Sequence, residues 1–334
     1  MAKPTVAIVG AGAIGGFFAA HLIDAGSADV TVCVRTPFTE LLVESEADNP
    51  PFGATSTEVA SATKVADGSA RGVTETASRE RPALRSVPNV VTDPADGKGP
   101  VDWVLLATKA HQTEGAAGWL RALVGPSTKV VVLQNGVEHE QRVRPFVNEQ
   151  TEIVPAVVYC GAEVIAPGHI VHRTNGFLIV PAGPAGDGLV ALYADARAGI
   201  RLTDDFRKVA WEKLCGNVVA NGITALTERR IEVMRVPAIA AVGHALVLEC
   251  IAVARAEGAA IDDSYADLLL EGIAMMPAGG GTSMLYDRMA GHPMEQDAKY
   301  GAVLRAGARH GIATPLHSTF HALLTAISEA PQQD

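Results

Sequence analysis

The sequence predicts two domains in one chain of 334 residues: an α/β domain with a mostly parallel sheet, followed by an all-helical domain. Three observations lead to this prediction. Short runs of β-branched residues alternate with helical patterns in the first half, and apolar residues recur at helical spacing after about residue 204. The length allows two domains of about 100–200 residues each, and the hydrophobic content of 48% is enough for a core in each. We place the domains at residues 1–203 and 204–334.

Four buried strands are predicted in the first domain, at residues 5–9, 30–34, 101–107 and 129–133, with helices at 14–25 and 113–123. Their hydrophobicity is continuous rather than alternating, which is typical of parallel strands covered on both faces. Three further strands are predicted at residues 153–159, 169–173 and 177–180. The second domain has predicted helices at residues 205–222, 238–257, 263–275, 294–310 and 316–328.

Residues 45–86 differ from the rest of the chain because their only large apolar side chains are Phe52, Val59, Val65, Val73 and Leu84. So little apolar surface cannot offset the entropy cost of ordering a segment of this length. The composition favours a flexible surface insertion between strands. A lid or a partner-binding loop is the functional alternative.

Charge and cysteine content exclude several classes of protein. With 27 Lys and Arg against 37 Asp and Glu, the net charge is −10, which disfavours binding to nucleic acid. The four cysteines lie in apolar stretches at no metal-ligand spacing, so we expect neither disulfides nor a metal site and favour a reducing cytoplasm. His244 and Glu249 interrupt the apolar run at residues 236–254, so we expect no membrane span.

A G-x-G-x-x-G motif follows the first predicted strand and opens the first helix; its residues are Gly10, Ala11, Gly12, Ala13, Ile14 and Gly15. In such a unit the first glycine permits a tight turn, the second lets the backbone approach a pyrophosphate, and the third allows close packing of helix on strand. The helix N-terminus adds N–H donors and a partial positive charge. This context favours a Rossmann-type dinucleotide site over a glycine-rich turn without a ligand.

The end of the second strand indicates which dinucleotide is bound. Sites for NAD place an Asp or Glu there, whereas here Arg35 and Thr36 follow the strand and the next acid is Glu40. An arginine suits the 2′-phosphate of NADP because it makes charge-assisted, often bidentate hydrogen bonds. We therefore predict NADP as cofactor; an ordinary solvated arginine is the alternative.

Polar residues follow two more predicted strands. Lys109 comes after the strand at residues 101–107, and Asn135 comes after the strand at residues 129–133. Ligands in open α/β sheets sit outside the carboxyl ends of strands, so we predict that both residues contact a ligand. Capping of the following helix is the alternative for each.

At the start of the helical domain, Lys213, Asn217 and Asn221 recur every four residues and form one stripe along a helix. Apolar residues flank the stripe, so it does not simply face solvent. Polar groups buried without partners cost about 1–3 kcal/mol each, which a bound polar substrate would relieve. A lysine held there has a lowered pKa and can act as a proton donor. A hydrogen-bond network that only joins the domains is the alternative.

Two later residues are, by spacing alone, ordinary residues of helix starts. Ser283 is a candidate helix cap, and Glu295 is a candidate first-turn acid after Pro293. Periodicity alone gives neither residue a functional role.

The chain resembles the ketopantoate reductases, or 2-dehydropantoate 2-reductases, in motifs that run in order along nearly its whole length. These motifs are VAIVGAGAIGG, TKAHQ, LQNG, WEKLCGNVVANGITAL, TSMLYDRMAGHPMEQDAKYGAV and HGIATP. The resemblance implies a Rossmann domain, a helical domain like the C-terminal domain of 6-phosphogluconate dehydrogenase, and an active site in the cleft between them. It also implies NADPH-dependent reduction of a branched 2-oxo acid in pantothenate synthesis. A cytoplasmic location and a homodimer are compatible with it.

The resemblance also implies a role for each candidate residue. Lys213 resembles the general acid that protonates the carbonyl oxygen, and Glu295 resembles the carboxylate that orients Lys213 or holds the substrate hydroxyl. The implied substrate-binding residues are Asn217, Asn221, Ser283 and Asn135. The implied cofactor-binding residues are the glycine motif, Arg35 at the 2′-phosphate, and Lys109 and Asn135 at the nicotinamide edge.

The chain departs from the family at Ile231 and Gly280, where some members place asparagines near the substrate, and its segment 45–86 is longer than expected. A pocket with fewer amide donors suits a 2-oxo acid that lacks the hydroxyl of ketopantoate. A reductase of another 2-oxo acid or a related carbonyl compound is therefore an alternative. A non-catalytic NADP(H)-binding regulator is a less favoured one, because Lys213 and Glu295 are both present.

Overall fold

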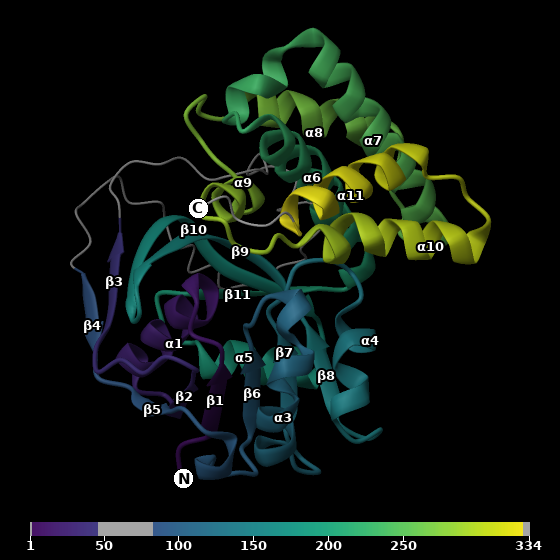
Figure 1. Ribbon diagram of the computed structural model, residues 1–334. Helices are drawn as coiled ribbons and strands as arrows, with labels where there is room; N and C mark the ends of the chain where they lie inside the picture. The colour runs from purple at the N-terminus through teal and green to yellow at the C-terminus, as the bar shows by residue number, and fades with distance from the viewer. Residues whose placement is uncertain (1, 46–82, 330–334) are drawn as a thin grey trace, which may run out of the picture. The chain divides into compact units, whose positions relative to one another are not determined.

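The computed structural model describes residues 2–45 and 83–329, and Figure 1 shows its ribbon. The described residues form two compact units. The first unit contains the residues up to Gln134 and the stretch His139–Asp204, and the second contains Asn135–Glu138 and the residues from Asp205 onward. Residues 46–82, which make up most of the predicted insertion, lie outside the described part of the chain.

The first unit is built on a six-stranded sheet in the order β5-β2-β1-β6-β7-β8. The strands are β1 (Thr5–Val9), β2 (Asp29–Cys33), β5 (Asn89–Val91), β6 (Trp103–Leu106), β7 (Lys129–Val132) and β8 (Glu152–Pro155). Every adjacent pair is parallel. The order runs outward from β1 in both directions, as in the doubly wound dinucleotide-binding fold. The predicted fold class is confirmed.

Both faces of this sheet are buried, because alternate residues of its strands enter two different apolar clusters. In β1, Val6 packs in one cluster with α1 (Ala13–Ala25), and Ala7 packs in the other with α3 (Ala117–Leu123). The second cluster also takes in part of α4 (His139–Val143). The continuous hydrophobicity of these strands follows from this burial on both sides.

The first unit also contains a second sheet, which the sequence pattern did not predict as a separate layer. Its order is β11-β10-β3-β4, and β9 pairs with β10. The strands are β3 (Leu41–Ser45), β4 (Leu84–Ser86), β9 (Val157–Ala166), β10 (His169–Pro181) and β11 (Gly199–Thr203), and α5 (Pro184–Leu192) packs on β11. In β3 and β4, Val43 lies opposite Leu84, so both ends of the predicted insertion at 45–86 are strands instead.

Two strand predictions were wrong in their division of the chain. The predicted strand at 153–159 is two strands, because the chain leaves the first sheet after β8 and joins the second sheet with β9. The predicted strands at 169–173 and 177–180 are one strand, β10, which continues through Gly176. Gly176 has a backbone φ of 151°, a value that residues other than glycine rarely adopt. Gly176 therefore lies inside the strand, at a register shift in the pairing of β10 with β9, and does not mark a strand end.

The second unit is helical, as predicted. Its helices are α6 (Phe206–Thr227), α7 (Pro237–Ala256), α8 (Ser264–Met275), α9 (Ser283–Met289), α10 (Ala302–His310) and α11 (Pro315–Ser328). Asp205 caps α6 by accepting a hydrogen bond from the backbone N–H of Lys208 at 3.0 Å. The predicted helix at 294–310 begins instead with a π-helical turn, Asp297–Gly301, which leads into α10. Helix α9 was not among the predicted ranges, although the interpretation of Ser283 as a helix cap implied a helix start there.

By length and composition alone, helix α7 is long and apolar enough to cross a bilayer. The sequence argument expected His244 and Glu249 to exclude a span. By composition these two residues do not exclude one. The carboxylate of Glu249 accepts hydrogen bonds from the backbone N–H groups of Leu316 and His317, at 2.9 and 3.1 Å. The charge in α7 thus anchors the start of α11 within the second unit.

Candidate active site

The glycine-rich turn joins β1 to α1 with very little room for side chains. Gly10 has a φ of 92°, and a Cβ there would lie 2.9 Å from Cγ2 of Thr108. A Cβ on Gly15 would overlap the carbonyl oxygen of Gly10. By contrast, a Cβ on Gly12 would meet no atom within 4 Å, so the backbone here is open to a ligand. The turn therefore combines close packing of α1 on β1 with an open backbone at the N-terminus of α1, as in the doubly wound dinucleotide-binding fold.

Two basic residues of the first unit follow strands of the same sheet. Arg35 lies exposed just after β2, and Lys109 lies partly buried just after β6. Because β6 pairs with β1, Thr108 contacts Gly10 and the residues after β6 lie beside the glycine turn. The first acid after β2, Glu40, is held by Arg85 through two hydrogen bonds of 3.0 and 2.9 Å.

The predicted stripe of polar residues lies on α6 of the second unit. Asn221 is buried, and Lys213 and Asn217 are partly buried. Asn221 donates a hydrogen bond from Nδ2 to Oδ1 of Asn217 at 3.3 Å, which is the i, i+4 contact that the spacing predicts. Burial lowers the pKa of Lys213 to about 8, because the ammonium form loses its hydration.

Asn221 is the centre of a wider hydrogen-bond network. Its Oδ1 accepts from Oγ of Ser283 at 2.8 Å, from Nζ of Lys299 at 3.0 Å and from the backbone N–H of Met284 at 3.4 Å. Residues from α6, α9 and the π-helical turn therefore meet at one side chain. The structure thereby brings together three of the predicted substrate residues: Asn217, Asn221 and Ser283.

The interpretation of Ser283 as a helix cap was wrong. The cap of α9 is Thr282, whose hydroxyl accepts from the backbone N–H of Leu285 at 3.3 Å. The Thr282 hydroxyl also shares a hydrogen bond of 2.7 Å with the hydroxyl of Thr224 on α6. Ser283 is the first residue of the helix, and its hydroxyl is free of capping and directed to Asn221.

Glu295 is not a first-turn acid either, since it precedes the π-helical turn and is 3% exposed. Its Oε2 accepts a hydrogen bond from Nδ2 of Asn135 at 2.8 Å. The segment Asn135–Glu138 is held in the second unit by a further contact, from Arg305 to Glu138 at 3.0 and 2.7 Å. Asn135 and Glu295 are therefore hydrogen-bond partners, which their spacing in the sequence could not reveal.

Sequence reasoning missed Lys299. This lysine is fully buried, and its ammonium donates to Asn221 and, at 3.4 Å, to Oγ of Ser283. The available signal was the position of Lys299 four residues after Glu295, one helical turn away on the same face of the predicted helix. That pattern was assigned to an ordinary helix, in which a lysine points to solvent.

The two positions at which the chain departs from the family contact each other. The backbone N–H of Ile231 donates to the carbonyl oxygen of Gly280 at 2.9 Å, and a Cβ on Gly280 would lie 3.7 Å from Cγ1 of Ile231. Ile231 is fully buried. The two differences are therefore one packing arrangement rather than two independent changes.

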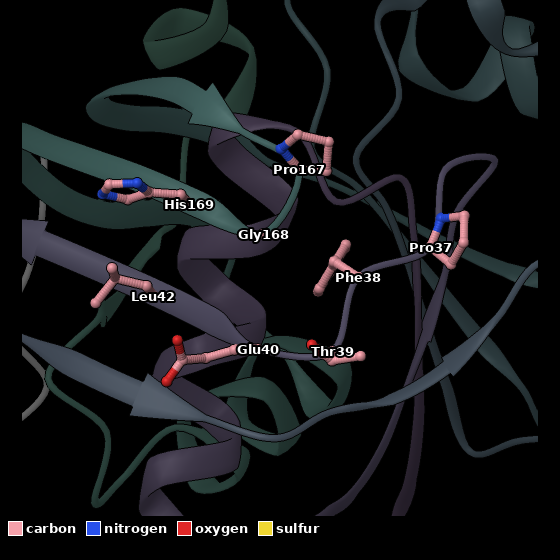
Figure 2. A pocket seen from close by; sticks show the side chains of 8 residues that line it. All are labelled: Pro37, Phe38, Thr39, Glu40, Leu42, Pro167, Gly168 and His169. Carbon is pink, nitrogen blue, oxygen red and sulfur yellow. The ribbon is translucent and has the colours of Figure 1, made fainter.

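A separate pocket of about 330 Å³ lies in the first unit and is shown in Figure 2. The residues that line it are Pro37, Phe38, Thr39, Glu40, Leu42, Pro167, Gly168 and His169. Its two titratable groups are engaged elsewhere, Glu40 with Arg85 and His169 with Glu44 at 2.6 Å. None of the predicted site residues lines this pocket. Among the described residues, no group of three or more His, Cys, Asp or Glu side chains could hold a metal ion.

A doubly wound sheet with a glycine-rich first turn, together with a helical unit that carries a lysine and a cluster of amides, defines a Rossmann-type oxidoreductase. Family models described as "Ketopantoate reductase PanE/ApbA" and "Ketopantoate reductase PanE/ApbA C terminal" match residues 6–185 and 205–328. The chain belongs to the PanE/ApbA ketopantoate reductase family, as its motifs indicated.

Comparisons with individual proteins lead to the same family. A 2-dehydropantoate 2-reductase from Caulobacter vibrioides is 40% identical over 96% of this chain and 98% of its own length. The crystal structure of a PanE/ApbA family ketopantoate reductase from Ralstonia eutropha JMP134 matches with a TM-score of 0.78 and 29% identity, covering 97% of this chain and 98% of that one. A dimeric ketopantoate reductase from Staphylococcus aureus shares the fold, with a TM-score of 0.78 and 24% identity over 97% and 99% of the two chains.

Proposed function

We propose that this protein reduces 2-dehydropantoate to pantoate with NADPH, as a step in pantothenate synthesis. The observation that carries the proposal is the hydrogen-bond network that joins Asn217, Asn221 and Ser283. These residues come from distant parts of the chain, and each was predicted to bind substrate. A cluster of amides and a hydroxyl beside a lysine of lowered pKa suits an oxygen-rich anion that receives a proton.

The residues of the first unit fit NADPH. The open space at Gly12 would admit a pyrophosphate to the backbone N–H groups at the start of α1, with Ala11, Ala13 and Ile14 beside it. Arg35, exposed at the end of β2, would hold the 2′-phosphate. Lys109 and Asn135 would bind at the nicotinamide edge. When bound, the reduced cofactor supplies the hydride for carbon 2 of the oxo acid.

The proton comes from the protein in this mechanism. As carbon 2 gains two electrons, its carbonyl oxygen becomes an alkoxide, and the ammonium of Lys213 donates a proton to it. The products are the 2-hydroxy acid and a neutral lysine, which regains its proton from water. A pKa of about 8 keeps Lys213 mostly protonated at neutral pH and makes it a better donor than an ordinary lysine.

The remaining site residues hold the substrate. Asn217, Asn221 and Ser283 would bind its oxygens, and holding it in attack geometry contributes up to about 7–11 kcal/mol in favourable systems. Glu295, buried and hydrogen-bonded to Asn135, would orient Lys213 or hold the substrate hydroxyl.

We further propose that residues 1–203 bind the cofactor and that residues 204–334 bind substrate and form a homodimer in the cytoplasm. The dimer is suggested by the Staphylococcus aureus neighbour, which is described as dimeric. The acidic composition and the four free cysteines are compatible with a reducing compartment.

One observation favours a second candidate, the reduction of a different 2-oxo acid or a related carbonyl compound. Where some family members have two asparagines, this chain packs Ile231 against Gly280. That arrangement removes two amide donors that could bind the hydroxyl of ketopantoate.

The experiment that separates these candidates follows NADPH oxidation by its absorbance, with ketopantoate and with a panel of 2-oxo acids that lack its hydroxyl. We expect the highest kcat/KM with ketopantoate. A higher value with a hydroxyl-free acid would favour the second candidate and leave the cofactor and the role of Lys213 in place. Turnover of no 2-oxo acid, together with tight NADPH binding, would contradict both candidates.

A further inference from the structure

We propose that Lys299 is a positioning residue: it fixes the direction of the Asn221 and Asn217 amides, so that Asn217 presents its NH₂ group to an oxygen of the substrate. This inference rests on the proposed reduction of a 2-oxo acid and identifies a residue that sets how the acid is bound. The hydrogen bonds from Lys299 to Asn221 and Ser283 lie within the second unit, and the preceding mechanism gives Lys299 no role.

The first step of the argument concerns burial. Lys299 is fully buried, although an ammonium loses more hydration free energy on burial than any neutral side chain. Its Nζ lies 3.0 Å from Oδ1 of Asn221 and 3.4 Å from Oγ of Ser283. An ammonium can only donate, so both of these oxygens must accept from it. Such charge-assisted hydrogen bonds are stronger than those between neutral groups.

The second step concerns the direction of Asn221. Three donors converge on its Oδ1: Lys299, Ser283 and the backbone N–H of Met284. A reversed amide would place its NH₂ group against an ammonium and a backbone N–H, neither of which can accept. The carbonyl oxygen of Asn221 must therefore face Lys299.

The third step passes this direction to Asn217. With its oxygen toward Lys299, Asn221 directs Nδ2 to Oδ1 of Asn217 at 3.3 Å. The oxygen of the Asn217 amide is thereby occupied, and its NH₂ group faces away from Asn221. Asn217 is partly buried on the same stripe of α6 as Lys213. An outward NH₂ group there suits a carboxylate or carbonyl oxygen, whereas a reversed amide would repel it.

The backbone that carries Lys299 is also held in place. Lys299 lies in the π-helical turn Asp297–Gly301, and such turns are frequent at functional sites. The hydroxyl of Tyr300 donates to the carbonyl oxygen of Val218 on α6. It occupies the space that a Cβ on Gly222 would need. The turn therefore packs closely on α6 beside Asn221.

The test is a double-mutant cycle with Lys299→Met and Asn217→Ala, measured with ketopantoate and NADPH. Methionine keeps the volume of lysine but cannot donate. We expect Lys299→Met to raise KM for the oxo acid about 10- to 100-fold, with the Kd for NADPH changed less than about 3-fold. Because Lys299 acts through Asn217, the double variant should have nearly the same KM as Asn217→Ala. Lys299→Gln, which restores a donor without charge, should recover part of the loss.

A matched control separates positioning from stability. Val303→Ala removes buried volume in the neighbouring α10 and should lower the melting temperature without changing KM. Multiplicative effects of Lys299→Met and Asn217→Ala, or an unchanged KM in Lys299→Met, would overturn the inference while the wild-type enzyme remains a reductase. A wild type that turns over no 2-oxo acid would overturn the proposed function and this inference with it.

Discussion

Asn135 donates a hydrogen bond from Nδ2 to Oε2 of Glu295 at 2.8 Å, although the two residues are 160 positions apart in the sequence. The contact joins the segment that follows β7 to the residue that precedes the π-helical turn. Glu295 is 3% exposed, so its carboxylate has little water around it and depends on such donors. A buried carboxylate with a fixed partner suggests a role for its negative charge, which a substitution that removes only the charge can test.

We predict that Glu295→Gln lowers kcat at least about 10-fold, because glutamine keeps an oxygen for Asn135 but removes the charge that would orient the lysine. If Glu295 acts on Lys213, the high-pH limb of the kcat profile should also move to lower pH. Steady-state kinetics across pH measures both. Glu140→Gln, which removes an exposed carboxylate paired with Arg144 in the first unit, is the control and should leave kcat unchanged. An effect of Glu295→Gln on KM alone would assign Glu295 to the substrate hydroxyl instead.

The glycine turn gives a matched pair of variants. A Cβ on Gly12 meets no protein atom, so Gly12→Ala should fold with an unchanged melting temperature but weaken NADPH binding at least about 10-fold by crowding the pyrophosphate. A Cβ on Gly15 overlaps Gly10, so Gly15→Ala should lower the melting temperature. Calorimetric titration and thermal unfolding distinguish the two. Normal NADPH affinity in Gly12→Ala would argue against a pyrophosphate at this turn.

Arg35 should determine the preference between cofactors. We predict that Arg35→Ala raises KM for NADPH about 10- to 100-fold, the effect of losing a charge-assisted contact to the 2′-phosphate, and leaves KM for NADH nearly unchanged. Arg121→Ala is the control, since Arg121 is also an exposed arginine of the first unit. Equal changes for both cofactors would mean that Arg35 does not contact the phosphate.

Glu249 should contribute stability that depends on pH. Burial raises the pKa of this carboxyl, but hydrogen bonds from His317 and from the backbone of α11 outweigh it, and the pKa lies below its ordinary value. A lowered folded-state pKa gives stability that is present above the unfolded pKa and lost as pH falls through the folded one. Glu249→Ala should therefore lower the free energy of unfolding by about 2–3 kcal/mol at pH 7.

The same comparison at lower pH provides the check. The difference between wild type and Glu249→Ala in denaturant unfolding should stay constant down to about pH 5 and shrink below about pH 4. A difference that persists at the lowest pH would assign the effect to packing rather than to the charge of Glu249.

The parallel sheet was predictable because its strands are buried on both faces, which produces continuous apolar runs at Thr5–Val9 and its neighbours. The second sheet was not, because its strands are partly exposed and β3 and β4 border the compositionally plain segment. Pro155 at the end of β8 and Gly176 within β10 were also ambiguous, because either residue can end a strand or lie inside one. Only the tertiary pairing determined that the first divides two strands and the second does not.

In the site, helical spacing alone placed Lys213, Asn217 and Asn221 together. The partners of that stripe could not be found in this way, because Ser283 and Lys299 reach it from other helices. Local pattern favoured Ser283 as a cap, although Thr282 one residue earlier performs that role. Family resemblance assigned Ser283 to the substrate site instead, and that assignment stays a prediction, whereas Lys299 emerged only from the three-dimensional contacts.

The central claim is that Lys213 supplies the proton in NADPH-dependent reduction of a 2-oxo acid. Its most direct test is single-turnover NADPH oxidation with ketopantoate, across pH, for wild type, Lys213→Ala and Lys213→Arg. For wild type we predict a rate that is constant below about pH 7, reaches half its maximum near the lowered Lys213 pKa of about 8, and falls further above it. Both variants should lose about 10²–10⁴-fold in rate and keep the NADPH affinity of wild type within about 3-fold. Equal loss of rate and affinity, or a wild-type rate with no fall above pH 8, would contradict the account.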